Sequence, residues 1–241
     1  MKLASYREMN NKKIVIHQPY YLSYPGLFHK LSMSDVFVIM DDVQYDKRFT
    51  NRNRIITKND WIWITVPIDK KDKFSKNSDV KINNEIDWKK HHWENIFHSY
   101  HTLPFFNTYQ DFFKNLYKKN WDMLFDLDFF IMKEMIKWLD LKIEIIRESE
   151  LDVNTESTQR LIDVCKKLDG QTYISGPGGK NYLDEKLFEK NNLNLIYQNY
   201  HHPKYPQKNS DNFIPDLSII DMFFNIGPDS SKLIKNEISY E

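Results

Sequence analysis

Residues 14–55 read IVIHQPYYLSYPGLFHKLSMSDVFVIMDDVQYDKRFTNRNRI, and this stretch holds two short apolar runs that each end at polar side chains. The first run ends at His17 and Gln18, and the second ends at Asp41 and Asp42. The segment between the runs is long enough for a helical crossover, which makes the two predicted strands parallel neighbours. Parallel neighbours bring their carboxyl ends to one edge of the sheet, where open α/β sheets bind ligands. We therefore expect His17, Asp41 and Asp42 to share one site.

The composition is that of a folded protein without a dominant charge. The 241 residues are 41% hydrophobic and 15% aromatic, which is enough to bury a large core, and we expect a single domain over residues 1–241. Lys plus Arg and Asp plus Glu are equal at 34 each, so no overall positive field draws the chain to nucleic acid or to anionic lipid. Binding to bulk nucleic acid is therefore not expected, and affinity for phosphate must come from a local cluster.

The single cysteine and the start of the chain predict a cytoplasmic protein. Cys165 alone forms no disulfide within the chain and supplies too few thiolates for a cysteine metal site. Residues 1–13 lack the apolar core of a signal peptide. No apolar run approaches the roughly eighteen residues that a membrane span needs.

Strand-like and helix-like segments alternate along most of the chain, which predicts an α/β fold with a Rossmann-like, mostly parallel sheet. Strands are predicted at Lys13–Ile16, Val36–Met40, Trp61–Pro67, Ile143–Arg147, Thr172–Ser175 and Asn194–Gln198. Helices are predicted at Gly26–Met33, Thr155–Leu168 and Tyr182–Lys190, and within Asp211–Gly227.

A helical insertion or cap is predicted over residues 86–140, because apolar residues recur there at helical spacing, as at Trp88, Ile96 and Tyr100. The polar stretch Lys70–Asn84 before it indicates a loop or an exposed hairpin. Residues 228–241 are polar and are predicted to form a flexible tail.

The glycine-rich segment Ser175–Lys180 predicts an anion site. Gly176, Gly178 and Gly179 follow a predicted strand and precede a predicted helix, so backbone N–H groups can converge on a phosphate at the helix N-terminus. Lys180 adds a full positive charge. The segment matches neither the P-loop nor the dinucleotide pattern, and a tight Pro-Gly turn without a ligand is the alternative.

The segment after the second apolar run is basic and is predicted to be a loop that clamps a phosphate or a carboxylate. Arginine makes forked contacts to both groups, and asparagine adds neutral donors and acceptors. A solvated loop with surface ion pairs is the alternative. The residues assigned to this clamp are Arg48, Asn51, Arg52, Asn53 and Arg54.

His17 is the candidate general base. Adjacent residues at the end of a strand point in opposite directions, so only one of Asp41 and Asp42 is expected to face His17 and orient its imidazole. The same carboxylate holds Mg²⁺ beside a phosphate in a second interpretation and caps a turn in a third.

Two histidines after the last predicted strand, His201 and His202, are assigned to substrate binding at the same edge, together with Gln18, Tyr21 and Ser175. Neighbouring histidines splay apart, and neither a carboxylate nor a cysteine lies at ligand spacing from them. No metal site is therefore assigned.

Several motifs, in order from Lys13 to Ser230, resemble the WbqC-like family of bacterial proteins: HQPYYLSYPGLFHKL, SDVFVIMDDVQYDKRFTNRNRI, WKKHHW, TYISGPGGKNYLD, YHHPKYPQ and LSIIDMFFNIGPDS. Where the family shows Asn-Tyr-Leu-Pro-Trp after Gln-Pro, this chain has Tyr-Tyr-Leu-Ser-Tyr. Proteins of this family are encoded among enzymes that build O-antigen, the lipopolysaccharide side chain, and other surface glycans. The resemblance therefore implies a cytoplasmic role in making an activated sugar.

Three functions are weighed on this basis. The first is an enzyme that forms an amide, transferring an acyl or aminoacyl group to the amine of a dTDP- or UDP-linked amino sugar, with a homodimer as one open oligomeric state. The second is a non-catalytic protein that binds a nucleotide sugar or serves as a scaffold in O-antigen assembly. Glycosyl transfer ranks last, because Asp41 and Asp42 are adjacent rather than spaced as D-x-D.

The cofactor is left open by the sequence. The first strand, the histidine-containing loop and the helix after them also resemble the start of pantothenate-synthetase-like ligases. ATP and Mg²⁺ are expected as cofactors only if the reaction is such a ligation.

Overall fold

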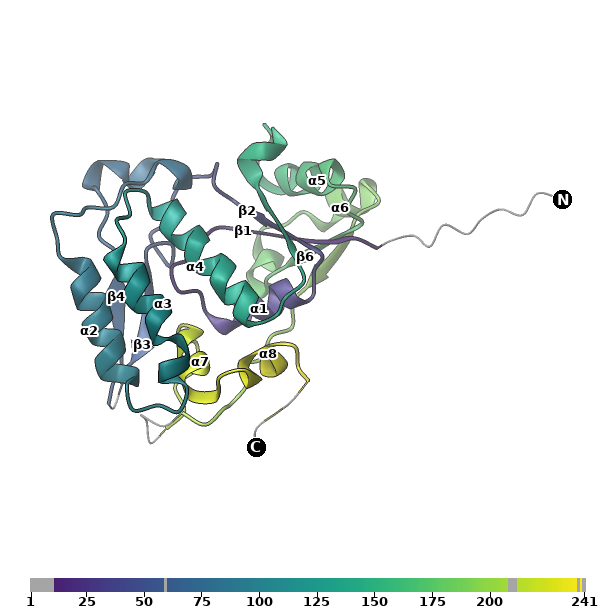
Figure 1. The fold of residues 1–241 in the computed structure, drawn as a ribbon. Coiled ribbons are helices and arrows are strands. Elements are labelled where there is room, and N and C mark those ends of the chain that lie inside the picture. Colours follow the sequence, from purple (N-terminus) through teal and green to yellow (C-terminus); the bar gives the residue numbers. More distant parts are fainter. Residues whose placement is uncertain (1–10, 59, 208–211, 238, 240–241) are drawn as a thin grey trace.

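Strand β1 lies at the centre of a five-stranded sheet in which every neighbouring pair is parallel (Figure 1). The computed structural model describes residues 11–58, 60–207, 212–237 and 239. The strand order is β5-β2-β1-β6-β7, which in chain order is 3-2-1-4-5, as in the Rossmann fold. The strands are β1 (Lys13–His17), β2 (Val36–Ile39), β5 (Glu144–Arg147), β6 (Thr172–Ser175) and β7 (Asn194–Tyr197). The predicted α/β fold and the parallel pairing of the first two strands are confirmed.

The alternation of side chains along the strands builds one core on each face of the sheet. Val15 and Phe37 point into the larger core, whereas Ile14, Ile16 and Val36 point into the smaller one. The larger core is covered by α1 (Pro25–Ser32), by the helical insertion and by the C-terminal helices. The smaller core is covered by α5 (Ser157–Lys167) and α6 (Glu185–Lys190), on the opposite side of the sheet in Figure 1.

The helical insertion consists of α2 (Trp88–Tyr100), α3 (Phe106–Lys118) and α4 (Leu124–Trp138), as the spacing of its apolar residues predicts. Its buried residues belong to the same continuous core as α1 and one face of the sheet. The insertion is therefore packed into the domain and is not a separate unit.

The basic segment predicted as a loop forms a strand instead. Strand β3 (Arg52–Ile56) pairs with β4 (Trp61–Thr65) in a separate two-stranded antiparallel sheet. Trp61–Pro67 was therefore correctly predicted as extended, but it does not join the parallel sheet. Two short 3₁₀ turns, η1 (Lys70–Phe74) and η2 (Asn77–Asp79), occupy the polar stretch after the hairpin.

The predicted flexible tail is wrong for residues 229–234. Helix α7 (Ile220–Ile226) is followed directly by α8 (Asp229–Ile234), which contacts α1. Leu233 and Ile234 are buried in the larger core, and Ser231 Oγ donates a 2.6 Å hydrogen bond to the carbonyl of Leu139. Two apolar side chains in an otherwise polar segment are enough to dock this helix.

Leu233→Ala is expected to lower the free energy of unfolding by about 2–5 kcal/mol, because it removes a fully buried side chain and leaves a cavity. Lys232→Ala, on the exposed side of the same helix, is expected to change it by less than about 0.5 kcal/mol. Urea unfolding followed by circular dichroism measures both values. Equal stability of the two variants would mean that α8 does not dock.

Candidate functional site

The sheet has a topological switch point between β1 and β6. From β1 the chain proceeds to β2 and β5 on one side, and then crosses to β6 and β7 on the other. The connections at the carboxyl ends of β1 and β6 therefore leave the sheet in opposite directions. Open α/β sheets bind ligands in the crevice at such a switch point. His17 ends β1 and Ser175 ends β6, so the structure brings these two predicted site residues to the switch point.

The hydrogen bond of His17 defines which of its ring nitrogens can accept a proton. Its Nδ1 lies 2.8 Å from the carbonyl oxygen of Gln18. A carbonyl only accepts, so Nδ1 carries the hydrogen and, in the neutral ring, Nε2 keeps its lone pair. Burial and then the charge of Lys30 lower the pKa of His17 to about 3, against the opposing effect of the Gln18 carbonyl. The imidazole is therefore neutral at pH 7.

Lys30 is a buried charged residue that the sequence pattern does not reveal. It lies in the last turn of α1, where a lysine ordinarily indicates the solvent-facing side of an amphipathic helix, yet it is only 5% exposed. Burial lowers the pKa of its ammonium to about 7. Among the described residues, it has neither an ion-pair nor a hydrogen-bond partner.

Tyr20 connects His17 to the loops around the site. Its ring packs edge-on against the imidazole, with the ring centroids 4.7 Å apart. Burial, and then the charges of Asp46 and Tyr24, raise the pKa of Tyr20 to about 12, and Tyr182 acts in the same direction. Tyr182 follows the glycine-rich turn, so its charge acts on Tyr20 from the connection after β6.

The glycine-rich segment was predicted to lead directly into a helix N-terminus, and this prediction is wrong. Residues Pro177–Asn181 form the 3₁₀ turn η4, and α6 begins only at Glu185. A Cβ atom on Gly179 would lie 2.1 Å from Ser175 Oγ, so this glycine permits close packing of the turn on β6. Gly176 and Gly178 have open space in the corresponding direction, and Lys180 Nζ lies 5.4 Å from the ring centroid of Tyr197.

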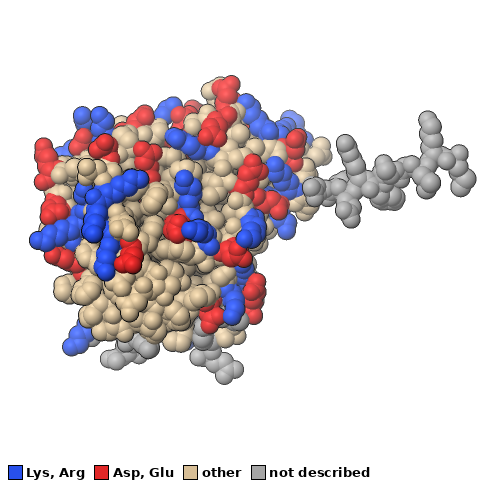
Figure 2. All heavy atoms as spheres, in the orientation of Figure 1, with Lys and Arg blue, Asp and Glu red and all other residues tan. Residues whose placement is uncertain are grey.

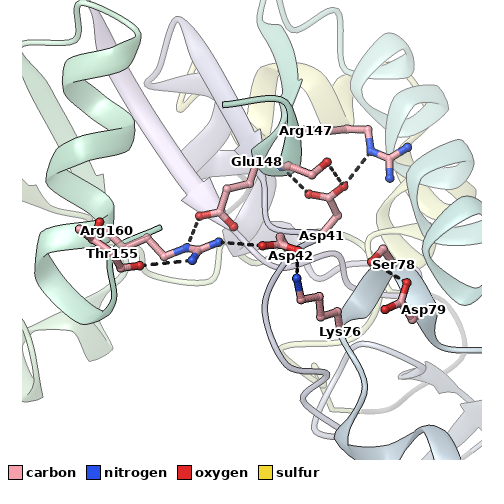
Figure 3. A network of polar contacts seen from close by, with 10 residues as sticks. Asp41, Asp42, Lys76, Ser78, Asp79, Arg147, Glu148, Thr155 and Arg160 are labelled. Atoms are coloured by element: carbon pink, nitrogen blue, oxygen red, sulfur yellow. Dashed lines mark hydrogen bonds and ion pairs between the residues drawn. The ribbon is translucent and has the colours of Figure 1, made fainter. Parts of the chain in front are cut away.

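The two predicted catalytic aspartates are engaged in structural contacts. Asp41 is fully buried and accepts hydrogen bonds from Arg147 Nε at 2.9 Å, Ser149 N at 2.9 Å and Ser149 Oγ at 2.6 Å (Figure 3). Burial alone would raise the pKa of Asp41, but these hydrogen bonds outweigh it and hold the pKa below its ordinary value. Its hydrogen bonds run to the last residue of β5 and to Ser149 beyond it, and none of those described joins it to His17.

Asp42 points to the opposite side, as expected for adjacent residues at a strand end. Its carboxylate pairs with Lys76 and, at 3.7 Å, with Arg160 of α5 (Figure 3). Arg160 also pairs with Glu148 at 2.6 Å. These contacts tie the ends of β2 and β5 to α5, and they leave neither predicted aspartate free to orient the imidazole.

The predicted arginine clamp is not formed. Arg48 pairs with Asp46, while Arg52 and Arg54 lie over the rings of Trp63 and Trp61 at 4.5 and 5.1 Å. Each cation thus already has a partner, Arg48 before β3 and the other two on the hairpin.

Asn51 and Asn53 are buried and satisfy backbone groups, so they are not exposed donors for a ligand. Asn51 Nδ2 donates to the carbonyl of Val66 at 2.8 Å, and Asn53 Nδ2 donates to the carbonyl of Leu22 at 2.8 Å. Their amides hold the hairpin to its surroundings.

Tyr21 is fully buried and cannot contact a substrate where it lies. His92 Nε2 is 3.2 Å from the carbonyl of Thr65, so its Nδ1 is the acceptor for the Tyr21 hydroxyl at 2.8 Å. The hydroxyl of Tyr117 completes the chain at 2.6 Å from that of Tyr21. The predicted binding residue thus anchors the loop after β1 to the helical insertion.

The remaining predicted binding residues are Gln18, whose carbonyl contacts His17, and the two histidines after β7. Gln18 Oε1 accepts a long 3.4 Å hydrogen bond from Asn77. His201 is exposed, whereas His202 is partly buried and its Nδ1 lies 3.0 Å from the carbonyl of Pro203.

Surface charge, metal ligation and thiol chemistry each constrain the function. Figure 2 shows positive and negative side chains interspersed over the face drawn, in keeping with the equal totals of the sequence. In the described part of the chain, no group of three or more His, Cys, Asp or Glu side chains could hold a metal ion. Burial raises the pKa of Cys165 to about 12, so its thiol is not an activated nucleophile.

The WbqC-like protein family matches residues 18–233, which is most of the chain. The chain belongs to this family. Among curated proteins, the WbqC-like chain is 27% identical over 226 residues to the uncharacterized protein Rv1507c of Mycobacterium tuberculosis (strain ATCC 25618 / H37Rv). The match covers 93% of this chain and 98% of the relative. No solved structure matches it.

The helices described for this WbqC-like protein include none with the length and apolar character needed to cross a bilayer.

Asp41→Asn is expected to lower the free energy of unfolding of the WbqC-like protein by about 3 kcal/mol at pH 7, because it removes the charge of a buried, hydrogen-bonded pair. The lowered pKa of Asp41 means that its contribution is complete above its unfolded pKa of about 4 and is lost as the pH falls through the lower, folded value. Urea unfolding at pH 7 and at acidic pH should therefore show the deficit shrinking on acidification.

Asp42→Asn is the matched control, with an expected loss below about 1 kcal/mol because its ion pairs are partly exposed. An Asp41→Asn protein with full stability would contradict the structural role given to Asp41.

Proposed function

We propose that this WbqC-like protein is an enzyme of surface-polysaccharide biosynthesis that forms an amide. It transfers an acyl or aminoacyl group to the amine of a dTDP- or UDP-linked amino sugar. The family supports a role in glycan assembly through the resemblance described above, and the site supports proton transfer. Asp41 and Asp42 take no part in the proposed reaction, because their carboxylates hold β2, β5 and α5 together.

The observation that carries the proposal is the acceptor nitrogen of His17 at the switch point. The Gln18 carbonyl fixes the tautomer, so in the neutral ring Nε2 is the nitrogen that keeps its lone pair. The neutral imidazole is in the protonation state that a general base needs at pH 7. An anionic ligand beside the ring would raise the pKa of His17 and make Nε2 a stronger base than it is in the free protein.

The proposed step is an ordinary acyl transfer. The amine nitrogen of the sugar attacks the acyl carbon, and the new C–N bond forms as the bond from that carbon to the leaving atom of the donor breaks. The leaving group departs with the electron pair of that bond. The proton lost by the amine passes to Nε2 of His17.

The second candidate is a nucleotide-sugar binding or scaffold protein. One observation favours it: none of the described carboxylates forms a hydrogen bond to His17, so the histidine lacks the orienting partner found in many acid–base sites. Binding and catalysis are separable by experiment.

The proposal is tested by incubating the purified protein with dTDP- and UDP-linked amino sugars and with acyl-thioester and aminoacyl donors, each with and without ATP and Mg²⁺. Mass spectrometry is expected to show a sugar nucleotide heavier by the transferred group. No mass gain with any combination would remove the amide-forming function.

His17→Ala is expected to lower the turnover number by about 10²–10⁴-fold while leaving the affinity for the nucleotide sugar within a few-fold, because it removes the base and few binding contacts. His98→Ala, which truncates an exposed histidine of α2, should retain both. Single-turnover assays and calorimetry measure the two quantities. If His17→Ala retains full function in cells, the scaffold function is favoured.

A further inference from the structure

We infer that Lys30 is the anion-binding residue of the switch-point site and that it receives a phosphate of a nucleoside diphosphate next to His17. The inference rests on the location of the proposed site, but it requires no amide chemistry. It replaces the predicted clamp of Arg48, Arg52 and Arg54, whose guanidinium groups already contact Asp46, Trp63 and Trp61.

The first step of the argument is the cost of the buried ammonium. A lysine that is only 5% exposed loses most of its hydration, and proteins ordinarily compensate such a charge with a carboxylate or with several hydrogen bonds. Lys30 has neither among the residues described. Titratable groups perturbed by burial cluster at functional sites, where a bound ligand can supply the missing charge.

The second step is the direction of the side chain. Helix α1 follows β1, so it begins near the carboxyl edge of the sheet and runs back toward the start of β2. Side chains on a helix lean toward its N-terminus, which directs Lys30 from the last turn back to that edge. His17 lies on the same face of β1 as Val15, the face that α1 covers, and the charge of Lys30 acts on the imidazole.

The third step is the charge of the other groups around α1. On the same helix, His29 is hydrogen-bonded to Gln198 and Asn236. On α8, which packs against α1, Asp229 is paired with Lys232 at 2.8 Å. The Lys30 ammonium is the charge that acts on His17. Among the described residues, no carboxylate neutralises this ammonium.

A consequence is that binding of the anion takes up protons. The pKa of about 7 leaves part of the Lys30 population neutral at pH 7 and most of it neutral at pH 8. A bound phosphate favours the charged forms of Lys30 and His17, so it raises both pKa values. Affinity should fall as the pH rises above 7, and binding at pH 8 should draw a proton from the buffer.

The test is calorimetric titration of the full-length protein with inorganic pyrophosphate, dTDP and UDP at pH 6.5 and pH 8. Titrations at pH 8 in Tris and in HEPES, whose ionisation enthalpies differ, report the number of protons taken up. The wild-type protein is expected to bind the nucleoside diphosphates about tenfold more tightly at pH 6.5 and to take up close to one proton at pH 8. If pyrophosphate binds as tightly as dTDP and UDP, the site recognises a free phosphate or pyrophosphate and not a nucleotide.

Three variants separate charge from folding. Lys30→Met should lose at least tenfold in affinity and should abolish proton uptake, and it should unfold at a higher temperature because an uncompensated buried ammonium has been replaced by an apolar chain of similar length. Lys30→Arg should keep the affinity at pH 6.5 but lose its pH dependence, because arginine stays charged. Lys180→Met, which removes the cation of the glycine-rich turn, is the control and should leave proton uptake unchanged.

Unchanged affinity in Lys30→Met, or binding without proton uptake, would overturn the inference. So would a borohydride-trapped adduct of Lys30 with an aldehyde substrate, which would make the lysine a nucleophile. Tight binding of dTDP without an amide product would instead leave the anion site in place and remove only the proposed reaction.

Discussion

Backbone pairing on both sides of β1 is the constraint on which the site depends. The pairing continues past the ends of the strands: the N–H of Met40 donates to the carbonyl of His17 at 2.9 Å, and the N–H of Gln198 donates to the carbonyl of Ser175 at 2.8 Å. These bonds continue the β1–β2 and β6–β7 pairing to the first residues of the loops. His17 is consequently part of the rigid sheet, although its side chain belongs to the edge where ligands bind.

The distribution of charge around this edge follows from what the carboxylates do. Asp41 is held by Arg147 and Ser149, and Asp42 and Glu148 share Arg160. Each acid stabilises the join between β2, β5 and α5, so none of them neutralises the interior near α1. A chain of zero net charge thus contains a local positive charge at Lys30, because these carboxylates are paired elsewhere in the fold.

The parallel core was predictable because buried strands are nearly continuous apolar runs, and β1, β2 and β6 have this form. Strand β3 was not predictable from the sequence, because polar residues such as asparagine are uncommon in strands. Asn53 is tolerated there because the carbonyls of Tyr21 and Leu22 accept hydrogen bonds from its buried amide. Lys30 was missed for a related reason. Sequence shows a charged residue on a helix, whereas burial depends on what packs against that helix.

Helix α8 illustrates the same limit of local pattern. Two apolar residues in a short polar segment carry too little periodicity to predict a helix, and their docking against α1 is decided by tertiary contact. The candidate site could likewise be located from the ends of the strands. The occupation of Asp41, Asp42 and the arginines by structural partners became evident only from geometry.

The helical insertion and the hairpin support the loop after β1 rather than cover it. Leu22 has a φ of 45°, which is strained for a bulky residue, and its carbonyl accepts hydrogen bonds from Asn53 and from Ser218 Oγ at 2.7 Å. Tyr21 adds its buried bonds to His92 and to the insertion. Strain held by this many contacts keeps Tyr20 and His17 in one arrangement, which is the preorganisation that positions a base.

The opposite wall of the site is built differently. Gly176 and Gly178 have no atom within 4 Å in the direction of a Cβ, and Tyr182 beyond them is 71% exposed. A turn with open space and few side-chain contacts adjusts at lower cost than a loop clamped by buried hydrogen bonds. Adjustment to a ligand therefore falls on the glycine-rich turn after β6, while the His17 side stays fixed.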